Sequence, residues 1–397
     1  MILKLEPQTL AEELGHLGVH PASEKIFLYK GEILPLKLVD IRTPAANIIK
    51  QEMLACGGDC AIPAGCVVCA EERVDAILLG TRKHYARLLE KLAQMPYFGM
   101  AAVQSELEAL LDPAPLQTIL ADGRTLTYDR MLVMGILNIT PDSFYADSRV
   151  PQLEQVLDRA GKMLEQGATI LDVGGESTRP GSDAVAADEE QQRVVPVIRA
   201  IKERYPDCII SIDTYRAATA QAALAAGADI INDVTAMAGD AAMADLVVSS
   251  KAPIILMHMR GTPKDMQQNC AYKNVVTEVA AYLVQQAQML AERGVSKDKI
   301  IFDPGIGFAK DVKQNLQLMQ GLKSLTGLGY PVLLAASRKS TVGSVLGCLP
   351  AEERLEGTIA TSCQAVYAGA QMVRVHDVQE NLRAIRMLEA ILCPSHI

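Results

Sequence analysis

The sequence predicts an α/β protein, a (β/α)8 TIM barrel preceded by a small N-terminal α+β domain. From residue 131 onward, short apolar runs rich in β-branched residues alternate with segments whose apolar residues recur at helical spacing. Eight such units in roughly 265 residues match the usual barrel length of about 250 residues. Polar residues also gather where the predicted strands end, and the active sites of such barrels lie at that face.

The eight predicted strands lack polar alternation, which is typical of parallel strands covered on both faces. In chain order they are residues 131–137, 169–173, 208–213, 230–233, 253–258, 300–303, 332–336 and 372–376. Helix-period segments between them include residues 153–166, 189–205, 217–226, 275–293 and 358–368. A doubly wound open sheet also alternates strands and helices, but eight evenly spaced units favour the closed barrel.

The region before the barrel lacks this alternation. A helical stretch begins at Pro44, residues 74–79 are typical of a strand, and residues 83–93 are typical of a helix. We therefore predict an N-terminal α+β extension over residues 1–115, to which the sequence assigns no role, and a catalytic barrel over residues 116–397.

A hairpin is predicted just before the first barrel strand. Segments 117–120 and 125–128 flank the dipeptide Asp122-Gly123, a strong turn signal. We expect this hairpin to plug the N-terminal end of the barrel.

Composition excludes several classes of protein. The 397 residues are 49% hydrophobic and 21% charged, with a net charge of −9. This acidic balance, without a Lys/Arg block, argues against nucleic acid as a partner. No apolar run approaches the roughly 18 residues of a membrane span. The N-terminus has no basic segment followed by an apolar segment, so we expect no secretory signal. Nine cysteines in such a chain indicate reduced thiols and a cytoplasmic protein.

Four cysteines cluster in the N-terminal region with the spacing C-x3-C-x5-C-x2-C, namely Cys56, Cys60, Cys66 and Cys69. Structural zinc sites usually have two close pairs separated by a longer insert, and only Cys66 and Cys69 have such a close spacing. Buried free thiols are therefore the expected state, with a zinc or iron–sulfur site as the alternative.

The loops after the first two strands carry candidate binding residues. Asn138 ends the first strand, where its amide oxygen can accept a hydrogen bond or bind a hard cation. After the second strand, Gly174 and Gly175 let the backbone approach a ligand, and Thr178 and Arg179 offer donors for an anion. For Asn138 the alternative is an Asn cap followed by a turn. For the loop after the second strand it is a solvated loop that binds nothing.

Asp213, Asn232 and Asp303 end the third, fourth and sixth strands. In a barrel these side chains would face one central pocket. A carboxylate can accept two parallel N–H bonds from a flat, amidine-like edge, and an amide can read a mixed edge. The set contains no histidine, which argues against a transition-metal site. For any one of these residues, a helix N-cap is the alternative.

The last two strands end in cationic residues. Lys339 can donate to a ring carbonyl or nitrogen, and Ser340 begins the next helix, where an anion can bind. Arg374 and His376 alternate along the eighth strand and therefore point the same way, which suits a second anion clamp. A salt bridge beneath the mouth and a hydrogen-bonded imidazole are the alternatives for these two residues.

Six motifs together resemble those of the dihydropteroate synthase family. They occur in the family's order, at residues 134–144, 172–182, 211–214, 303–308, 337–340 and 374–376. The resemblance implies a barrel enzyme of folate biosynthesis. It would join 6-hydroxymethyl-7,8-dihydropterin pyrophosphate to para-aminobenzoate, giving 7,8-dihydropteroate and pyrophosphate.

The resemblance also implies how the pterin is held. Asp213, Asn232, Asp303 and Lys339 would bind it, and Asp303 and Lys339 would also act in catalysis. Asn138 would bind a Mg²⁺ ion that bridges the pyrophosphate.

The other substrate groups would be bound at the rim. Arg374, His376 and Thr178 would hold the phosphates, with Arg179 nearby, and Arg374 and His376 would stabilise the leaving group. Ser340 would take the aminobenzoate carboxylate. The resemblance further suggests a homodimer.

The first loop departs from the family pattern. The family usually continues Ser-Asp-Gly-Gly after the phenylalanine, whereas this chain reads Tyr-Ala-Asp-Ser-Arg at 145–149. Two other functions stay open. A pterin-dependent methyltransferase would share the pterin-binding set but would need no pyrophosphate clamp. A non-catalytic pterin-binding regulatory protein would suit the altered loop.

Overall fold

The computed structural model describes residues 1–397 except 140–148, 177–184, 262–265, 267–268 and 395–397, and it describes only the backbone of 149–151. The chain forms two compact units, Met1–Ala114 and Pro115–Ile397. None of the described helices has the length and apolar character needed to cross a membrane.

The N-terminal unit is an antiparallel sheet with helices packed on it. Strand order is β1-β3-β2, with β1 at Leu34–Arg42, β2 at Asp59–Ala61 and β3 at Arg73–Gly80. Its helices are η1 (Pro7–Thr9), α1 (Leu10–His16), α2 (Pro21–Leu28), α3 (Thr43–Cys56), η2 (Ala64–Val68), α4 (Arg82–Leu92) and α5 (Met100–Leu111). The predicted helix at Pro44, strand at 74–79 and helix at 83–93 correspond to α3, β3 and α4.

Alternating burial along β3 explains how this unit forms a core. Val74, Ala76 and Leu78 are buried and pack with residues of α3, α4 and α5, whereas the residues between them are exposed. Of the clustered cysteines, Cys56, Cys60 and Cys66 belong to the same core, and Cys69 is exposed.

The second unit is the predicted (β/α)8 barrel. Eight parallel strands follow the order β11-β10-β9-β8-β7-β6-β13-β12, and a parallel bridge between Phe302 and Val332 joins the two ends. The strands are β6 (Leu132–Asn138), β7 (Ile170–Gly174), β8 (Ile209–Asp213), β9 (Ile230–Asp233), β10 (Ile254–Met257), β11 (Ile300–Asp303), β12 (Leu333–Leu334) and β13 (Met372–Val375).

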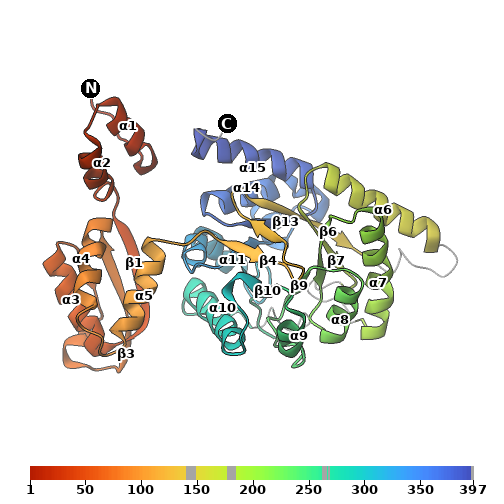
Figure 1. Cartoon of the computed structure of the whole chain (residues 1–397), viewed down its shortest axis with the longest axis horizontal. Helices are drawn as coiled ribbons and strands as arrows, with labels where there is room; N and C mark the ends of the chain where they lie inside the picture. Colours follow the sequence, from red (N-terminus) through yellow and green to blue (C-terminus); the bar gives the residue numbers. More distant parts are fainter. Residues whose placement is uncertain (140–148, 177–184, 262–265, 267–268, 395–397) are drawn as a thin grey trace. The chain divides into compact units, whose positions relative to one another are not determined.

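Helices surround these strands (Figure 1). They are α6 (Arg149–Glu165), α7 (Ala187–Arg204), α8 (Ala217–Ala225), α9 (Met243–Ser250), α10 (Val275–Glu292), α11 (Val312–Gln320), α12 (Leu322–Thr326), α13 (Ser340–Val345), α14 (Leu355–Tyr367) and α15 (Val378–Leu392). Local signals set some of their ends. The Asn274 side chain caps α10, and Asp311 with Gln314 forms a capping box at the start of α11.

A short hairpin closes the N-terminal end of the barrel, as predicted. Its strands are β4 (Gln117–Ile119) and β5 (Thr125–Thr127). Leu120 and Leu126 of this hairpin are buried in one cluster with Met134, Ile170 and other inward residues at the beginnings of the barrel strands. The N-terminal end of the barrel is thus filled with apolar side chains, and the polar side chains lie at the C-terminal ends of the strands.

Candidate active site

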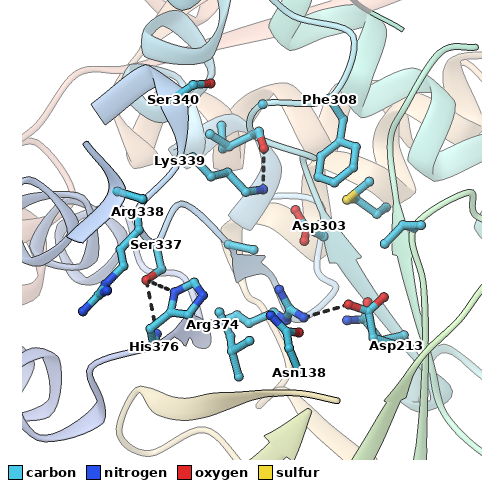
Figure 2. A pocket seen from close by; sticks show the side chains of 18 of the residues that line it. Asn138, Asp213, Asp303, Phe308, Ser337, Arg338, Lys339, Ser340, Arg374 and His376 are labelled. Atoms are coloured by element: carbon cyan, nitrogen blue, oxygen red, sulfur yellow. Dashed lines mark hydrogen bonds and ion pairs between the residues drawn. The ribbon is translucent and has the colours of Figure 1, made fainter. Parts of the chain in front are cut away.

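A cavity of about 430 Å³ lies at the C-terminal ends of the barrel strands (Figure 2). It is lined by eight of the residues that the sequence singled out, namely Asn138, Asp213, Asn232, Asp303, Lys339, Ser340, Arg374 and His376. Of the other predicted site residues, Thr178 and Arg179 lie outside the described residues, as does the altered first loop from 140 to 148. The cationic side chains in the lining come from β13, which carries Arg374, and from the segment after β12, which carries Lys339.

Arg374 is held by two carboxylates from neighbouring strands. Its Nε donates to Asp172 Oδ2 at 2.5 Å. Its Nη2 donates to Asp213 Oδ2 at 2.7 Å, a contact that Figure 2 shows. Burial by itself would lower the pKa of the Arg374 guanidinium, but the charges of Asp172 and Asp213 raise it. Arg374 therefore stays cationic, and Asp213 has one oxygen left for a ligand.

Asn232 is oriented by the same carboxylate. Its Nδ2 lies 3.3 Å from each oxygen of Asp172, which can only accept hydrogen bonds. The amide oxygen of Asn232 must then point away from Asp172. In the part of the chain that the structure describes, neither Asn232 Oδ1 nor Asp213 Oδ1 has a hydrogen-bond partner, although both atoms are buried. Such atoms call for a ligand that donates hydrogen bonds.

The carboxyl group of Asp213 also has an unusually high pKa. Burial raises the pKa of its carboxyl group to about 7, and the negative charges of Asp172 and Glu190 act in the same direction. Arg374 and Lys339 oppose this rise. A carboxyl group that titrates near neutral pH inside a cavity is a frequent property of functional sites.

Asp303, at the end of β11, and Lys339, directly before α13, also line the cavity. Asp303 is buried, and its Oδ1 accepts a 2.7 Å hydrogen bond from the Gly305 N–H. Lys339 donates to the Ile306 carbonyl, and its Nζ lies 4.7 Å from the centre of the Phe308 ring. Burial lowers the pKa of Lys339 to about 8 and raises that of Asp303. Each charge favours the ionised form of the other group.

His376 is fixed by Ser337. The Ser337 hydroxyl lies 2.9 Å from His376 Nδ1 and accepts a hydrogen bond from the His376 backbone N–H at 3.2 Å. Burial lowers the pKa of His376 to about 4, and the charges of Arg374 and Arg338 act in the same direction. The imidazole is therefore neutral at pH 7. A Ser337 hydroxyl that donates to Nδ1 leaves Nε2–H as the donor toward the cavity.

Several residues in or next to the cavity had no predicted role. Asp172 lies outside the lining, yet it orients both Arg374 and Asn232. An acidic residue within an otherwise apolar strand was the available signal. Arg338 lines the cavity and pairs with Asp377 through hydrogen bonds of 2.9 and 2.6 Å. Glu176, also in the lining, is bonded to Arg216. These pairings join residues far apart in the chain, so spacing alone did not reveal them.

The fit of a hard cation can be judged from the donors present. Asn138 offers one amide oxygen at the cavity's edge. Among the described residues no group of three or more His, Cys, Asp or Glu side chains could hold a metal ion. Mg²⁺ commonly keeps several waters and binds through few protein ligands together with substrate phosphates. The donor set fits an ion of that kind, bound mainly through a phosphorylated ligand.

Sequences similar to this chain belong to enzymes that bind pterins. The profile of the family described as pterin binding enzyme matches residues 134–376. The dihydropteroate synthase of Bacillus subtilis is 44% identical over 277 residues, which are 70% of this chain and 94% of that protein. The dihydropteroate synthase of Streptococcus pyogenes serotype M6 is 46% identical over 271 residues, which are 68% of this chain and 99% of that protein.

Solved structures similar to this chain are also dihydropteroate synthases. The Xanthomonas albilineans dihydropteroate synthase with 4-aminobenzoic acid has a TM-score of 0.65 at 38% identity, over 70% of this chain and 99% of that one. The Burkholderia cenocepacia dihydropteroate synthase complexed with 7,8-dihydropteroate has a TM-score of 0.64 at 38% identity, over 71% of this chain and 98% of that one.

One similarity extends beyond the barrel. A probable bifunctional folylpolyglutamate synthase/dihydropteroate synthase of Halobacterium salinarum is 39% identical over 352 residues, which are 88% of this chain and 42% of that protein. Pro115–Ile397 is too short to account for this match, so it includes part of the N-terminal unit.

Proposed function

The chain belongs to the dihydropteroate synthase family of pterin-binding enzymes, and we propose that its barrel cavity condenses 6-hydroxymethyl-7,8-dihydropterin pyrophosphate with para-aminobenzoate. The products are 7,8-dihydropteroate and pyrophosphate. One observation carries the proposal: Asp213 Oδ1 and Asn232 Oδ1 are buried acceptors that find no partner among the described residues, in a cavity also lined by Lys339, Arg374 and His376. A flat ring with several N–H donors and an anionic tail complements such a cavity.

The acceptors hold the pterin ring. The amino and ring N–H groups of the pterin donate to Asp213, Asn232 and Asp303, and Lys339 donates to an acceptor atom of the ring. The carboxylate of Asp303 offsets positive charge that develops on the ring as the bond to pyrophosphate breaks. Because these groups are already fixed by the protein, little reorganisation accompanies the charge development.

The cationic rim holds the pyrophosphate. Arg374 is positioned by its two carboxylates through Nε and Nη2, so its Nη1 is left to donate to a phosphate oxygen. His376 donates through Nε2–H as a neutral imidazole. Both donors stabilise the leaving group's growing charge. We assign Thr178 and Arg179 to the same anion, and Ser340 to the aminobenzoate carboxylate, from their matching positions in the family.

Substitution then proceeds at the pterin methylene carbon. The C–O bond to pyrophosphate breaks, leaving a cation that is delocalised into the ring, and the amine nitrogen of para-aminobenzoate forms the new C–N bond and loses a proton. Exclusion of water from the cavity prevents competing hydrolysis. No covalent bond to the protein is needed.

A divalent metal ion takes part in catalysis in this family, and we propose that Mg²⁺ is that ion, with Asn138 as its protein ligand. When bound, it would neutralise charge on the pyrophosphate oxygens. Supporting this choice are the hard amide oxygen of Asn138 and the lack of a multi-residue His, Cys, Asp or Glu cluster among the described residues.

Other parts of the proposal concern the whole chain. The N-terminal unit is proposed as an independent domain of unassigned role. A homodimer stays a prediction, which sedimentation of the full chain would test. The cytoplasm is the proposed compartment, because all nine cysteines are free thiols, as expected in a reducing environment.

The deciding experiment is formation of dihydropteroate, followed by mass spectrometry, from the two substrates with Mg²⁺ or with EDTA. We expect product with Mg²⁺, and a large loss of product both with EDTA and in the Asn138→Ala variant. No product from folded protein that binds the pterin substrate would contradict the proposal and favour a non-catalytic pterin-binding protein.

A further inference from the structure

A buried lysine lies directly beneath the loop that follows β11, and the proposed reaction does not use it. The Lys310 side chain is only 2% exposed. Its Nζ lies 3.0 Å from the Gly305 carbonyl oxygen, 2.9 Å from that of Phe308 and 3.2 Å from that of His258. The imidazole Nδ1 of His258 is a fourth contact, at 3.0 Å. An ammonium group has three protons, so the three carbonyls alone can use all of its donors.

The imidazole beside Lys310 adds no opposing charge. Burial lowers the pKa of His258 to about 3, and the positive charges of Lys310 and Arg260 act in the same direction. His258 is therefore neutral at pH 7. Its ring also packs edge-on against Tyr282, with ring centres 5.0 Å apart, which holds the imidazole in place.

The loop around Lys310 has a backbone that turns its carbonyls inward. Gly305 and Gly307 have φ values of +70° and +86°, and Ala309, a non-glycine residue, has φ of +50°. A side chain at Gly305 would be impossible, since an added Cβ would lie 2.0 Å from the His258 carbonyl oxygen. Converging carbonyl oxygens repel one another unless a cation lies between them. Lys310 Nζ occupies that position. Burial lowers the pKa of this amine to about 7, while the charge of Asp303 and the three carbonyl acceptors favour the ammonium form.

The same loop supports the pterin side of the cavity. The Gly305 N–H is hydrogen-bonded to Asp303 Oδ1, and the Ile306 carbonyl accepts a hydrogen bond from Lys339. The Phe308 ring also lies next to Lys339 Nζ. Thus Lys310 bonds to the carbonyls of Gly305 and Phe308, while the Gly305 N–H and the Ile306 carbonyl of the same loop bond to Asp303 and Lys339.

We propose that Lys310 is a positioning residue whose ammonium group acts as a tethered monovalent cation: it holds the 303–308 loop in the conformation that aligns Asp303 and Lys339 for the pterin. This inference rests on the proposed function but assigns a role to a residue that touches neither substrate. Lys310 therefore affects pterin binding through the loop. It leaves the aminobenzoate end of the cavity, at Ser340, largely unaffected.

Three full-length variants test this role. Lys310→Met keeps most of the stem and removes the charge, and Lys310→Ala opens a space that propylammonium fits. Lys313→Met is the matched control, because Lys313 is exposed at the start of α11 and undergoes the same change of charge. The readouts are the Kd of 6-hydroxymethyl-7,8-dihydropterin pyrophosphate by calorimetry, the KM values of both substrates, and kcat.

We expect Lys310→Met to raise the Kd and KM of the pterin substrate on the order of 100-fold, as for small displacements of binding groups. The KM of para-aminobenzoate at saturating pterin should change less than about twofold, and Lys313→Met should match the wild type. Propylammonium should restore pterin binding to Lys310→Ala, whereas 1-propanol, which has the same length but no charge, should not. A variant that merely contained less folded protein would instead lower kcat with both KM values unchanged.

Three results would overturn the inference: unchanged pterin affinity in Lys310→Met, an equal effect on both KM values, or no restoration by propylammonium. If Lys310→Ala folds poorly, propylammonium but not 1-propanol should restore its folding as well. If propylammonium does not restore folding, Lys310 is not the positioning residue proposed here. A wild type that binds the pterin without forming product would contradict the proposed function, while the Kd values would still decide the role of Lys310. A wild type that does not bind the pterin would overturn both.

Discussion

Arg374 and Asp172 form an ion pair within the barrel, with Arg374 Nε 2.5 Å from Asp172 Oδ2 and Asp172 completely buried. The same carboxylate receives the amide of Asn232. A single acidic side chain therefore sets the direction of one proposed phosphate-binding group and one proposed pterin-binding group. Removing one partner of a buried pair leaves the other charge without compensation, which is far more costly than losing an exposed pair.

The first prediction concerns this pair. Asp172→Asn should lower the free energy of unfolding of the barrel by about 1–3 kcal/mol, less than the roughly 3–5 kcal/mol for a buried charge left unpaired, because Arg374 loses one buried counter-charge and keeps Asp213. Urea denaturation monitored by circular dichroism would measure the change. The control is Glu154→Gln, whose ion pair with Arg204 is exposed and should contribute less than about 1 kcal/mol. Equal effects of the two substitutions would show that the buried pair is not important for stability.

The second prediction is a bell-shaped pH dependence of kcat/KM for the pterin substrate. Asp213 has a pKa of about 7, and its Oδ2 already accepts from Arg374, so protonation would turn Oδ1 from an acceptor for the ring into a donor. Activity should therefore fall as the pH decreases below about 7. Lys339, with a pKa of about 8, donates as a cation, so activity should also fall as the pH rises above about 8. Lys339→Arg should move the basic limb to higher pH, since arginine stays charged. A profile that is flat from pH 6 to 9 would contradict both assignments.

A third prediction isolates the lysine in the cavity. Lys339→Ala should weaken binding of the pterin substrate about 10- to 100-fold, because a hydrogen bond to a charged group contributes about 1.5–3 kcal/mol. Calorimetry gives the affinity directly. Lys323→Ala is the control, because Lys323 lies over the exposed ring of Tyr367, outside the cavity lining. Unchanged affinity in Lys339→Ala would remove Lys339 from the pterin site.

The fourth prediction tests independence of the two units. Deleting residues 1–114 should leave a folded barrel, since the buried core of the N-terminal unit shares no residue with the clusters of the barrel. The alignments with the Bacillus and Streptococcus relatives support this expectation, as they cover 94% and 99% of those proteins with about 70% of this chain. Thermal unfolding and dihydropteroate formation by the truncated chain are the measurements. Aggregation of the shortened protein would refute independence.

Much of the fold could be predicted because its causes are local. Apolar runs such as β10, whose residues are all buried, are contiguous in sequence and indicate strands covered on both faces. Turn signals are equally local, as the Asp122-Gly123 hairpin shows. The segments predicted as strands or helices did not include β1, β2, α1, α2 and α5 of the N-terminal unit or α9, α11, α12 and α15 of the barrel, and the predicted strand 332–336 shortens to Leu333–Leu334. The shortest of these elements carry little periodic signal.

The sequence by itself determined the alternation of strands and helices, and therefore which polar side chains meet at the C-terminal face of the barrel. Only the tertiary structure decided how those side chains are paired. Arg374 and Asp172 are 202 positions apart, and closing the barrel brings them together. Lys310 meets His258, 52 positions away, for the same reason. Periodicity is a property of neighbouring residues, whereas a pKa shift or an orphaned acceptor depends on burial and on charges from distant strands. Spacing cannot encode these effects, and the three-dimensional arrangement of the strands sets them.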